Sequence, residues 1–298
     1  MPRSLGLLAV LLLLAGCAVT PDSRTAAVPD EDVLTAVRAV PALHAELPAG
    51  LRARGTLLLG TPPTPGTSSL PHGGRVHGRD VGLDVDLRMA VAKVLGVRLT
   101  VARGTFATIV PGVQNGKYDV GQGNFAVTRA RERAVDFATY LHDGQSFLVS
   151  AGVRAARIRG LADLCGYTVA TSPGSTFQQI LDRGTGVCAA HGKEPYTAQY
   201  FPDTGPIFLG LANGKVDVYF GPSLSLRYDA AHIPGTRLAG EYSSTPVGFV
   251  TAKGSPLAPA LRDAVNHLIT TGQYGRILRK WGVGGGVRES ELNPPAAL

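Results

Sequence analysis

Apolar residues along the chain alternate between two spacings, one typical of strands and one typical of helices. Residues 56–60 and 97–101 are short apolar runs that predict strands. Between them, residues 84–95 place apolar side chains three and four positions apart, which predicts a helix with Asp84 as its N-cap. Alternation of strands and helices predicts α/β lobes with largely parallel sheets. The same reasoning predicts helices at 105–115, 174–182, 205–213, 223–231, 257–271 and 273–281, and strands at 120–127, 167–171, 216–220 and 247–252.

One hexapeptide pattern, Asn-Gly-Lys-x-Asp-Val, occurs twice, at Asn115–Val120 and at Asn213–Val218. Each copy follows an apolar run at helical spacing, so its Gly can supply the left-handed residue that ends a helix and its Asp-Val can open the next strand. Two lobes that share this unit are the simplest explanation, and a coincidental match is the alternative. Because similar α/β lobes usually hold a ligand where they face each other, residues 121–128 and 219–225 are candidate cleft walls.

The N-terminus has the pattern of a targeting segment and is excluded from the fold. Arg3 precedes an apolar run of ten residues, far fewer than the roughly twenty that a membrane-spanning helix needs. The run ends in Leu-Ala-Gly-Cys at residues 14–17, which resembles a bacterial lipobox whose Cys17 becomes the lipidated first residue. Cleavage elsewhere, with Cys17 incidental, is the alternative. We therefore expect a signal peptide over 1–17 and a lipid anchor on the extracytoplasmic face of a bacterial membrane.

Two cysteines, Cys165 and Cys188, remain once the lipidated one is set aside. An even pair in an oxidising compartment predicts a disulfide bond. The bridge would close a short loop and stabilise the fold by about 3 kcal/mol on the chain-entropy account. Two free buried thiols are the alternative.

Composition and charge narrow the classes of partner. The net charge is +7, but Lys and Arg are spread along the chain without interleaved aromatic residues, and no nucleic-acid-binding motif is present. We therefore expect no nucleic acid partner, although the charge favours an anionic envelope or anionic ligands. Among the seven histidines, His72 and His77 lie in a Gly-rich loop with no third ligand at metal spacing. They are predicted to be exposed loop residues, and we expect neither a metal nor a cofactor.

Several motifs occur in one order along the chain. Residues 82–87 read Gly-Leu-Asp-Val-Asp-Leu, the first hexapeptide copy follows, and residues 128–137 place an Arg three positions after Thr and a Phe six positions later. The last motif of the series is Gly-x-Tyr at residues 272–274, followed by Lys-Trp at residues 280–281. Together these motifs resemble the extracellular solute-binding proteins of family 3, the polar amino-acid receptors of ABC importers. The resemblance covers about residues 45–283.

The resemblance implies a periplasmic-binding-protein-like α/β fold with two lobes, a two-strand hinge and a ligand cleft between them. Lobe I would consist of 50–147 plus 247–283 and lobe II of 148–246, after a spacer and short helical preface over 18–49 and before a flexible tail over 284–298. It also implies a monomer without catalytic activity. Such a protein passes a small carboxylate-bearing solute, an amino acid or a derivative of one, to an ABC permease in the membrane.

Arg131 falls where the family places its carboxylate-binding arginine. A planar guanidinium can grip a carboxylate with two parallel charge-assisted hydrogen bonds. Across the cleft, the resemblance puts Gly174, Ser175 and Thr176 at a helix start, where backbone N–H groups and hydroxyls bind the same carboxylate. The alternative for Arg131 is a solvated charge on a helix. The other candidate ligand-binding residues are Asn124, Phe125, Ala126, Pro222 and Ser223.

Two departures from the family pattern bear on the ligand. The family commonly places an Asp for the ligand's α-ammonium five residues after the Asp of the second lobe's strand, but five residues after Asp217 stands Pro222. The loop over 61–80 has no aromatic residue to cover the ligand, and Asn124 and Ala126 replace small hydroxyl residues. We therefore expect a carboxylate ligand that is not an ordinary free α-amino acid, or one whose amine finds another acceptor. A degenerate paralogue that binds little is the alternative.

Two other function classes use the same fold. Periplasmic dehydratases act on small carboxylic acids, and His142 and Glu241, near the predicted hinge strands, could serve as acid or base. A nucleophile elbow is missing, because residues 221–225 read Gly-Pro-Ser-Leu-Ser and lack the final Gly. Catalysis is therefore not expected. A ligand sensor for a membrane kinase is the third class, and the sequence does not separate it from an importer component.

Overall fold

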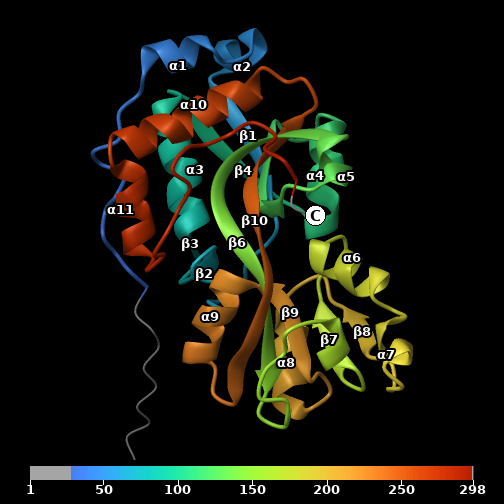
Figure 1. Ribbon diagram of the computed structural model, residues 1–298. Helices are drawn as coiled ribbons and strands as arrows, with labels where there is room; N and C mark the ends of the chain where they lie inside the picture. The colour runs from blue at the N-terminus through green and yellow to red at the C-terminus, as the bar shows by residue number, and fades with distance from the viewer. Residues whose placement is uncertain (1–27, 297) are drawn as a thin grey trace, which may run out of the picture.

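The structure is a computed structural model that describes residues 28–296 and residue 298. The predicted signal peptide and the lipidation site at Cys17 lie outside the described residues. Figure 1 shows an upper and a lower half, which share one eight-stranded sheet in the order β4-β1-β5-β10-β6-β9-β7-β8. Two long antiparallel strands, β6 (Val135–Ser150) and β10 (Thr236–Ala252), run through both halves. The predicted two-lobed α/β fold is confirmed.

The upper half is built on three parallel strands, β1 (Thr56–Thr61), β4 (Arg98–Arg103) and β5 (Val120–Ala126). Helices cover the sheet, and a small hairpin precedes α3. These elements are α1 (Pro41–Ala45), α2 (Ala49–Arg54), β2 (Gly74–Val76), β3 (Arg79–Val81), α3 (Leu83–Val94), α4 (Phe106–Gln114), α5 (Arg129–Glu132), α10 (Leu257–Thr270) and α11 (Gln273–Lys280).

The lower half repeats the plan on a smaller scale. Strand β7 (Thr168–Thr171) lies between β8 (Thr197–Tyr200) and β9 (Val218–Pro222), and both pairings are parallel. Its helices are the 3-10 helix η1 (Leu161–Leu164), α6 (Thr176–Arg183), α7 (Val187–Ala190), α8 (Gly205–Asn213) and α9 (Ser223–His232).

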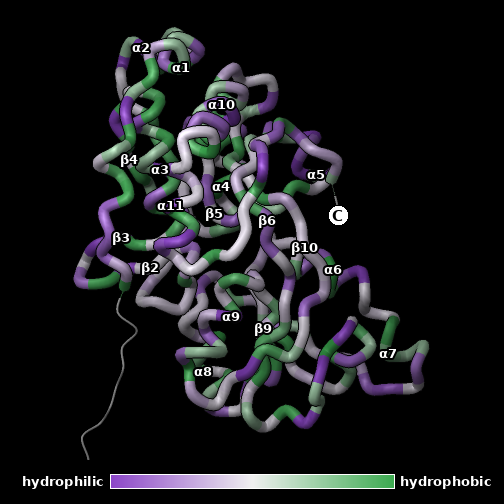
Figure 2. The backbone as a smooth tube through the Cα atoms, turned by 60° about the vertical axis from the view of Figure 1, so that its left-hand side comes forward, coloured by the Kyte–Doolittle hydropathy of each residue, from purple (hydrophilic) through white to green (hydrophobic). Residues whose placement is uncertain are grey.

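Each half has its own hydrophobic core. In the upper half Leu59 of β1 packs with Val91 of α3 and Leu261 of α10, and in the lower half Val169 of β7 packs with Phe220 of β9. In Figure 2 apolar segments lie inside each half, for example along β9, and many outer loops are hydrophilic. The fully buried members of each cluster belong to one half, and the halves are joined by β6, β10 and contacts such as those of Leu224 and Tyr228 of α9 with the upper core.

The repeated hexapeptide forms the same turn in both halves. Gly116 and Gly214 have φ of 76° and 73°, the left-handed conformation that ends a helix. Asp119 Oδ2 then accepts a hydrogen bond from the backbone N–H of Leu58 on the neighbouring strand, at 2.8 Å. Asp217 Oδ2 accepts the equivalent bond from Thr168 N–H, also at 2.8 Å. The repeat therefore couples each helix–strand turn to the adjacent parallel strand.

Several predicted boundaries are wrong in instructive ways. The N-cap of α3 is Gly82, and Asp84 lies inside the first turn, where its N–H bonds to the His72 carbonyl at 3.0 Å. The loop over 61–80 contains the β2–β3 hairpin. The strand predicted at 247–252 is only the end of β10, because the Gly- and Ser-containing stretch before it lacks strand-like alternation but pairs along most of β6.

The C-terminal tail was predicted to be flexible, but it is bonded to the upper half. Thr139 N–H donates to the Glu291 carbonyl at 3.0 Å, and the Asn293 side chain bonds both to Phe137 N–H at 2.8 Å and to Asp136 at 2.9 Å. Ser290 is 1% exposed. The tail therefore lies along the outer edge of β6, where backbone polar groups would otherwise have no partner.

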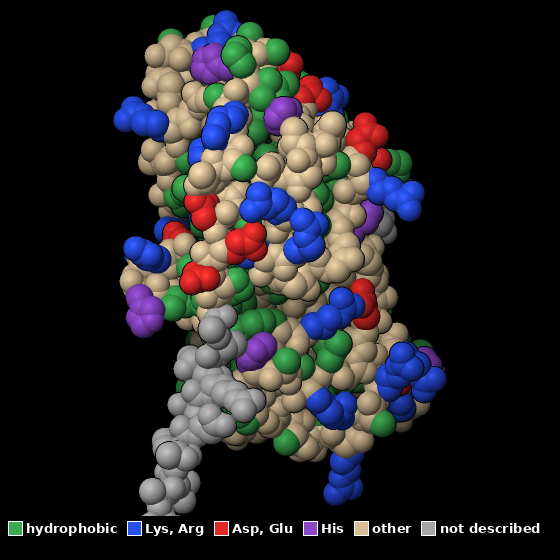
Figure 3. Space-filling view, turned by 90° about the vertical axis from the view of Figure 1, so that its left-hand side faces the viewer, with side chains coloured by type: hydrophobic (Ala, Val, Ile, Leu, Met, Phe, Trp, Pro, Cys, Tyr) green, Lys and Arg blue, Asp and Glu red, His purple; other side chains and the backbone are tan. Residues whose placement is uncertain are grey.

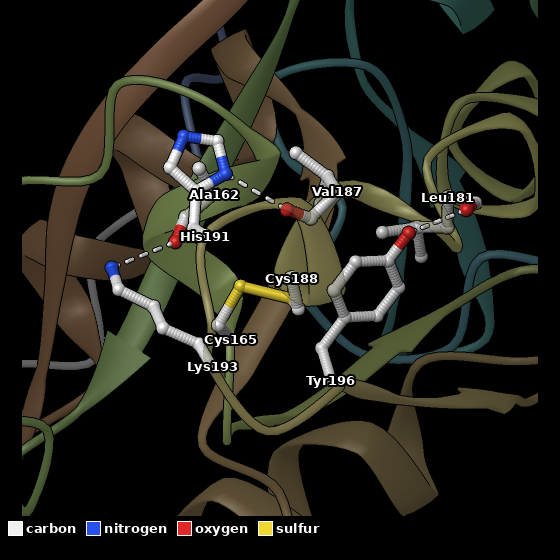
Figure 4. Close-up of a disulfide and its surroundings, with 8 residues drawn as sticks. All are labelled: Ala162, Cys165, Leu181, Val187, Cys188, His191, Lys193 and Tyr196. Carbon is white, nitrogen blue, oxygen red and sulfur yellow. Dashed lines mark hydrogen bonds between the residues drawn. A yellow bond between two sulfur atoms is a disulfide. The ribbon is translucent and has the colours of Figure 1, made fainter.

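A disulfide joins Cys165, just after η1, to Cys188 in α7, with the Cα atoms 5.6 Å apart (Figure 4). The predicted pairing is confirmed. In the same region Lys193 Nζ donates to the Ala162 carbonyl at 3.4 Å. The bridge thus fastens an irregular corner of the lower half.

No helix within the described residues is long and apolar enough to span a bilayer. Figure 3 shows Lys and Arg side chains scattered over both halves of one face, without a single basic patch.

Candidate functional site

A cleft lies between the halves, and both contribute to its lining. The upper half supplies Thr61, Arg88, Arg103, Phe106 and Arg131, and the lower half supplies Ser172, Ser175, Thr176, Asp203, Tyr219 and Pro222. Asp143, Gly144 and Gln145 come from β6, where this strand passes from one half to the other. The arrangement places the cleft where two similar lobes face each other.

Arg131 stands in this cleft because α5 begins just before it. The Thr128 hydroxyl accepts a hydrogen bond from Arg131 N–H at 3.2 Å and caps the helix. The guanidinium donates to the carbonyl of Ala126 at 3.0 Å and, across the cleft, to that of Gly174 at 3.2 Å. The residue is 9% exposed, so it is not the solvated helix charge that was its alternative.

The electrostatic setting of Arg131 favours an anion. Burial lowers the pKa of Arg131 to about 10, so the guanidinium remains charged at neutral pH. Its Cζ lies 5.7 Å from the ring centres of Phe106 and Phe125. Among the described residues, no carboxylate pairs with it. A buried cation that is satisfied only by carbonyls and ring faces retains donors for an incoming carboxylate.

The opposite wall is the N-terminus of α6. Gly174 has φ of 74°, and a Cβ there would approach Ala107 Cβ to 3.0 Å, so glycine allows the two halves to meet. The Ser175 hydroxyl accepts from Gln178 N–H at 3.1 Å and donates to the Ser172 carbonyl at 2.6 Å. Because the first N–H groups of a helix lack partners within it, this end offers donors and a partial positive charge to the cleft.

The remaining predicted site residues divide into two groups. Asn124, Ala126 and Pro222 line the cleft. Phe125 is fully buried and points to the other side of β5, where its ring packs 4.8 Å from Phe106, behind the guanidinium. Ser223 is 1% exposed, and its hydroxyl bonds to that of Ser146. Phe125 and Ser223 therefore do not lie on the cleft surface: successive side chains of a strand face opposite sides, and the Ser223 hydroxyl is turned towards Ser146.

His72 is a cleft residue that sequence reasoning missed. It is 6% exposed, not an exposed loop residue, and its Nε2 lies 2.9 Å from Asp143 Oδ2 while its Nδ1 lies 3.5 Å from Asp84 Oδ2. Burial by itself lowers the pKa of His72, but the two carboxylates outweigh it and raise the pKa to about 10. The imidazolium is therefore charged at neutral pH. Nothing in the sequence links positions 72, 84 and 143, which the fold brings together.

The halves touch directly across the cleft. Ser225 Oγ of α9 donates to the Ser69 carbonyl at 3.0 Å, and the hydroxyls of Ser68 and Thr204 are 3.1 Å apart. Ser68 and Ser69 belong to the loop before the hairpin, which covers the cleft with polar and proline residues and, as predicted, without an aromatic ring. Together with the Arg131–Gly174 bond, these contacts describe halves that are drawn together.

The acid–base candidates at the long strands are not cleft residues. His142 is exposed, and Glu241 forms an ion pair with Arg227 at 2.6 Å. The described residues contain no group of three His, Cys, Asp or Glu side chains that could hold a metal ion.

Comparison with known proteins identifies this architecture. The bacterial extracellular solute-binding proteins, family 3, match residues 68–284. The chain belongs to this family. The arginine-binding protein ArgT of Corynebacterium glutamicum is 30% identical to this solute-binding protein over 298 residues, covering 97% of this chain and 93% of that protein.

Solved structures agree. An ancestral arginine-binding protein bound to arginine is 31% identical, with a TM-score of 0.67 over 77% of this chain and 99% of that one. An ancestral arginine-binding protein bound to glutamine is 30% identical, with the same TM-score. An enzyme is also related: the cyclohexadienyl dehydratase of Pseudomonas aeruginosa is 24% identical over 68% of this chain. The relatives with higher identity are named for binding.

Proposed function

We propose that this solute-binding protein is the lipid-anchored substrate-binding component of an ABC importer and that it captures a free amino acid. The observation that carries the proposal is Arg131, a buried guanidinium in the cleft that no carboxylate of the described residues neutralises. Relatives named as arginine-binding, and a related structure bound to glutamine, make an amino acid the ligand class to test first.

The ligand carboxylate lies between Arg131 and the first turn of α6. Arg131 binds it with two charge-assisted hydrogen bonds. The N–H groups at Ser175 and Thr176 bind it from the lower half, where the helix end favours a negative charge. The Gly174 carbonyl, which now accepts from Arg131 at 3.2 Å, gives up part of this bond to the ligand. A ligand that touches both halves stabilises the closed arrangement by the contacts it makes only there.

Closure is a rotation of one half about β6 and β10, the two strands that cross between them. The closed form is then recognised by a membrane permease. The lipobox pattern at residues 14–17 supplies the anchor, so that a monomer remains near its permease. Globomycin-sensitive processing, and loss of membrane attachment in Cys17→Ser, would support the anchor, and an unchanged membrane fraction in this variant would refute it.

Isothermal titration with L-arginine, L-glutamine and their α-carboxamides tests the function. We expect at least one free amino acid to bind and its carboxamide to bind about 30-fold or more weakly, because the underpaired guanidinium costs about 2 kcal/mol or more. Arg131→Gln should cause a similar loss. Arg129→Gln is the matched control, since Arg129 is exposed on the same short helix. Binding by Arg131→Gln within about threefold of wild type would reject the carboxylate role.

A further inference from the structure

The amine of an amino-acid ligand needs an acceptor, and the acidic residue that the family commonly uses is missing from the expected position. Pro222, where β9 passes into α9, lines the cleft but has no side-chain acceptor. If the proposed function holds, the ammonium must be bound by another group in the cleft, or the ligand must lack one. The inference below rests on that function and addresses only the amine.

A carboxylate stands beside this junction on a different strand. Asp143 of β6 lies two residues before Gln145, which pairs with Pro222, and Asp143 Oδ1 accepts from Leu224 N–H of α9 at 3.1 Å. Asp143 lines the cleft and is 3% exposed. Its oxygens are already occupied: Gly144 N–H also donates to Oδ1 at 2.8 Å, and His72 and Asn124 donate to Oδ2. Asp143 is therefore a support and not a free acceptor.

What Asp143 supports is the side chain of Asn124. Asn124 Nδ2 donates to Asp143 Oδ2 at 2.8 Å. Because a carboxylate only accepts hydrogen bonds, the atom that faces it must be the amide NH₂, which fixes the orientation of the amide. Asn124 Oδ1 is then turned away from Asp143, and it is buried without a partner among the described residues. Asn124 has φ of 56°, a conformation that asparagine tolerates better than most residues.

A second buried acceptor in the cleft is also unsatisfied. Asp84 lines the cleft and is 7% exposed, and its Oδ1 has no hydrogen-bond partner among the described residues. Buried acceptors without donors are rare and costly. Two of them, on Asn124 and Asp84, border a cleft that also contains Arg131, so a ligand with both an anionic and a donating group suits the cleft.

We infer that Asn124 Oδ1 accepts a hydrogen bond from the ligand's α-ammonium and that Asp143 is the positioning residue that holds the Asn124 amide for it. This pair takes the place of the acceptor that Pro222 lacks. The ligand class is then an amino acid with a free α-ammonium, recognised by an amide oxygen backed by a carboxylate. The alternative ligand is a carboxylic acid without an amine. With such a ligand, only water could donate a hydrogen bond to Asn124 Oδ1 and Asp84 Oδ1.

The test compares each amino acid with its des-amino analogue. The probe pairs are L-arginine with 5-guanidinopentanoate and L-glutamine with glutaramate. Wild type should prefer the amino acid of one pair by about 10-fold or more, the size of a hydrogen bond to a charged group. In Asn124→Gly, which keeps the left-handed backbone, this preference should fall to within about threefold, while the des-amino analogue should bind nearly as before.

Asn293→Gly is the matched control. Asn293 also has positive φ, at 45°, and its Nδ2 also donates to a carboxylate, Asp136, at 2.9 Å, but it lies on the tail outside the cleft. It should keep the wild-type preference. Adding Pro222→Asp to Asn124→Gly should restore the preference by returning an acceptor to the junction, and this rescue separates a lost acceptor from a damaged fold.

The outcomes are distinguishable. Equal wild-type affinity for both members of the binding pair overturns the inference but leaves the carboxylate function standing. A preference that survives intact in Asn124→Gly also overturns it. If wild type binds neither member of either pair, the proposed function fails and the inference fails with it.

Discussion

The two halves use the same turn to fold but supply different chemistry to the cleft. Asp119 and Asp217 make the same 2.8 Å bond to a neighbouring strand. In the cleft, by contrast, the upper half supplies most of the charged side chains, such as Arg131 and His72, whereas the lower half supplies a helix end, small hydroxyl residues such as Ser175 and one carboxylate, Asp203. The two halves therefore share a structural turn, but they contribute different chemical groups to ligand binding.

The same contrast extends to buried carboxylates. Asp84 and Asp143 lie next to the His72 imidazolium at the cleft, but Asp229 in α9 is fully buried, and neither of its oxygens has a partner among the described residues. Burial raises the pKa of Asp229 to about 9. At the cleft, the charge of His72 is thus balanced by two neighbouring carboxylates. In the lower half, Asp229 has no such partner and is therefore protonated at neutral pH.

The largest expected effect comes from Asp229→Asn. The folded state holds a proton on Asp229 that the unfolded chain releases above about pH 4, so wild-type stability is lost as pH rises from there towards 9. The neutral variant should gain stability over wild type, by about 4 kcal/mol more at pH 8 than at pH 5. Urea unfolding at both pH values measures this. If the difference in unfolding free energy between the variant and wild type does not change with pH, Asp229 is ionised or solvated in the folded protein.

Removing the disulfide should affect only the lower half. The pair of changes Cys165→Ala and Cys188→Ala frees the corner between η1 and α7 and should cost about 3 kcal/mol through the entropy of the unfolded loop. Hydrogen exchange should report faster opening of β7 and α6 and unchanged protection of β1 and α3. Equal loss of protection in both halves would show that they unfold as one unit.

The repeated turn offers a direct test of symmetry. Asp119→Ala and Asp217→Ala each remove an ionised acceptor from a backbone N–H, which should cost about 1.5–3 kcal/mol. We expect the two costs, measured by denaturant unfolding, to agree within about 1 kcal/mol. Lys117→Ala and Lys215→Ala are controls, since these exposed side chains make no such bond. Strongly unequal costs would reject a shared structural role.

The smallest effect concerns the contacts that draw the halves together. Ser225→Ala removes the hydroxyl that donates to the Ser69 carbonyl at 3.0 Å. One neutral hydrogen bond contributes about 1 kcal/mol, so ligand affinity should fall by about fivefold. Small-angle scattering without ligand should show a more extended protein. An unchanged scattering profile with unchanged affinity would mean that this contact does not favour closure.

Much of the fold follows from local sequence patterns. Helix α8 has the predicted bounds, Gly205–Asn213, because an apolar run meets a glycine that ends the helix. The repeated hexapeptide predicted two matching turns, and both form. The motif around Thr128 and Arg131 placed the guanidinium in the cleft, since the cap and the arginine are neighbours in sequence. Helix ends, tight turns and helix caps can be predicted because they depend on residues that are only a few positions apart in the sequence.

What the sequence did not predict depends on distant residues. His72, Asp84 and Asp143 meet only because the hairpin folds back over the start of α3 and next to β6. The length of β10 and the docking of the tail depend on pairing with β6, which supplies partners for segments without clear periodicity. Phe125 and Ser223 were assigned to the cleft by position in a motif, but the direction of a side chain is decided by strand and helix geometry.

A double-mutant cycle tests the central claim, that Arg131 grips the ligand carboxylate. One change is Arg131→Gln in the protein, and the other is conversion of the bound amino acid to its α-carboxamide, with the four affinities measured by isothermal titration. If the two groups contact each other, the second change costs little once the first is made, and the coupling energy is about 1.5 kcal/mol or more. Losses that simply add, with coupling near zero, would contradict the account.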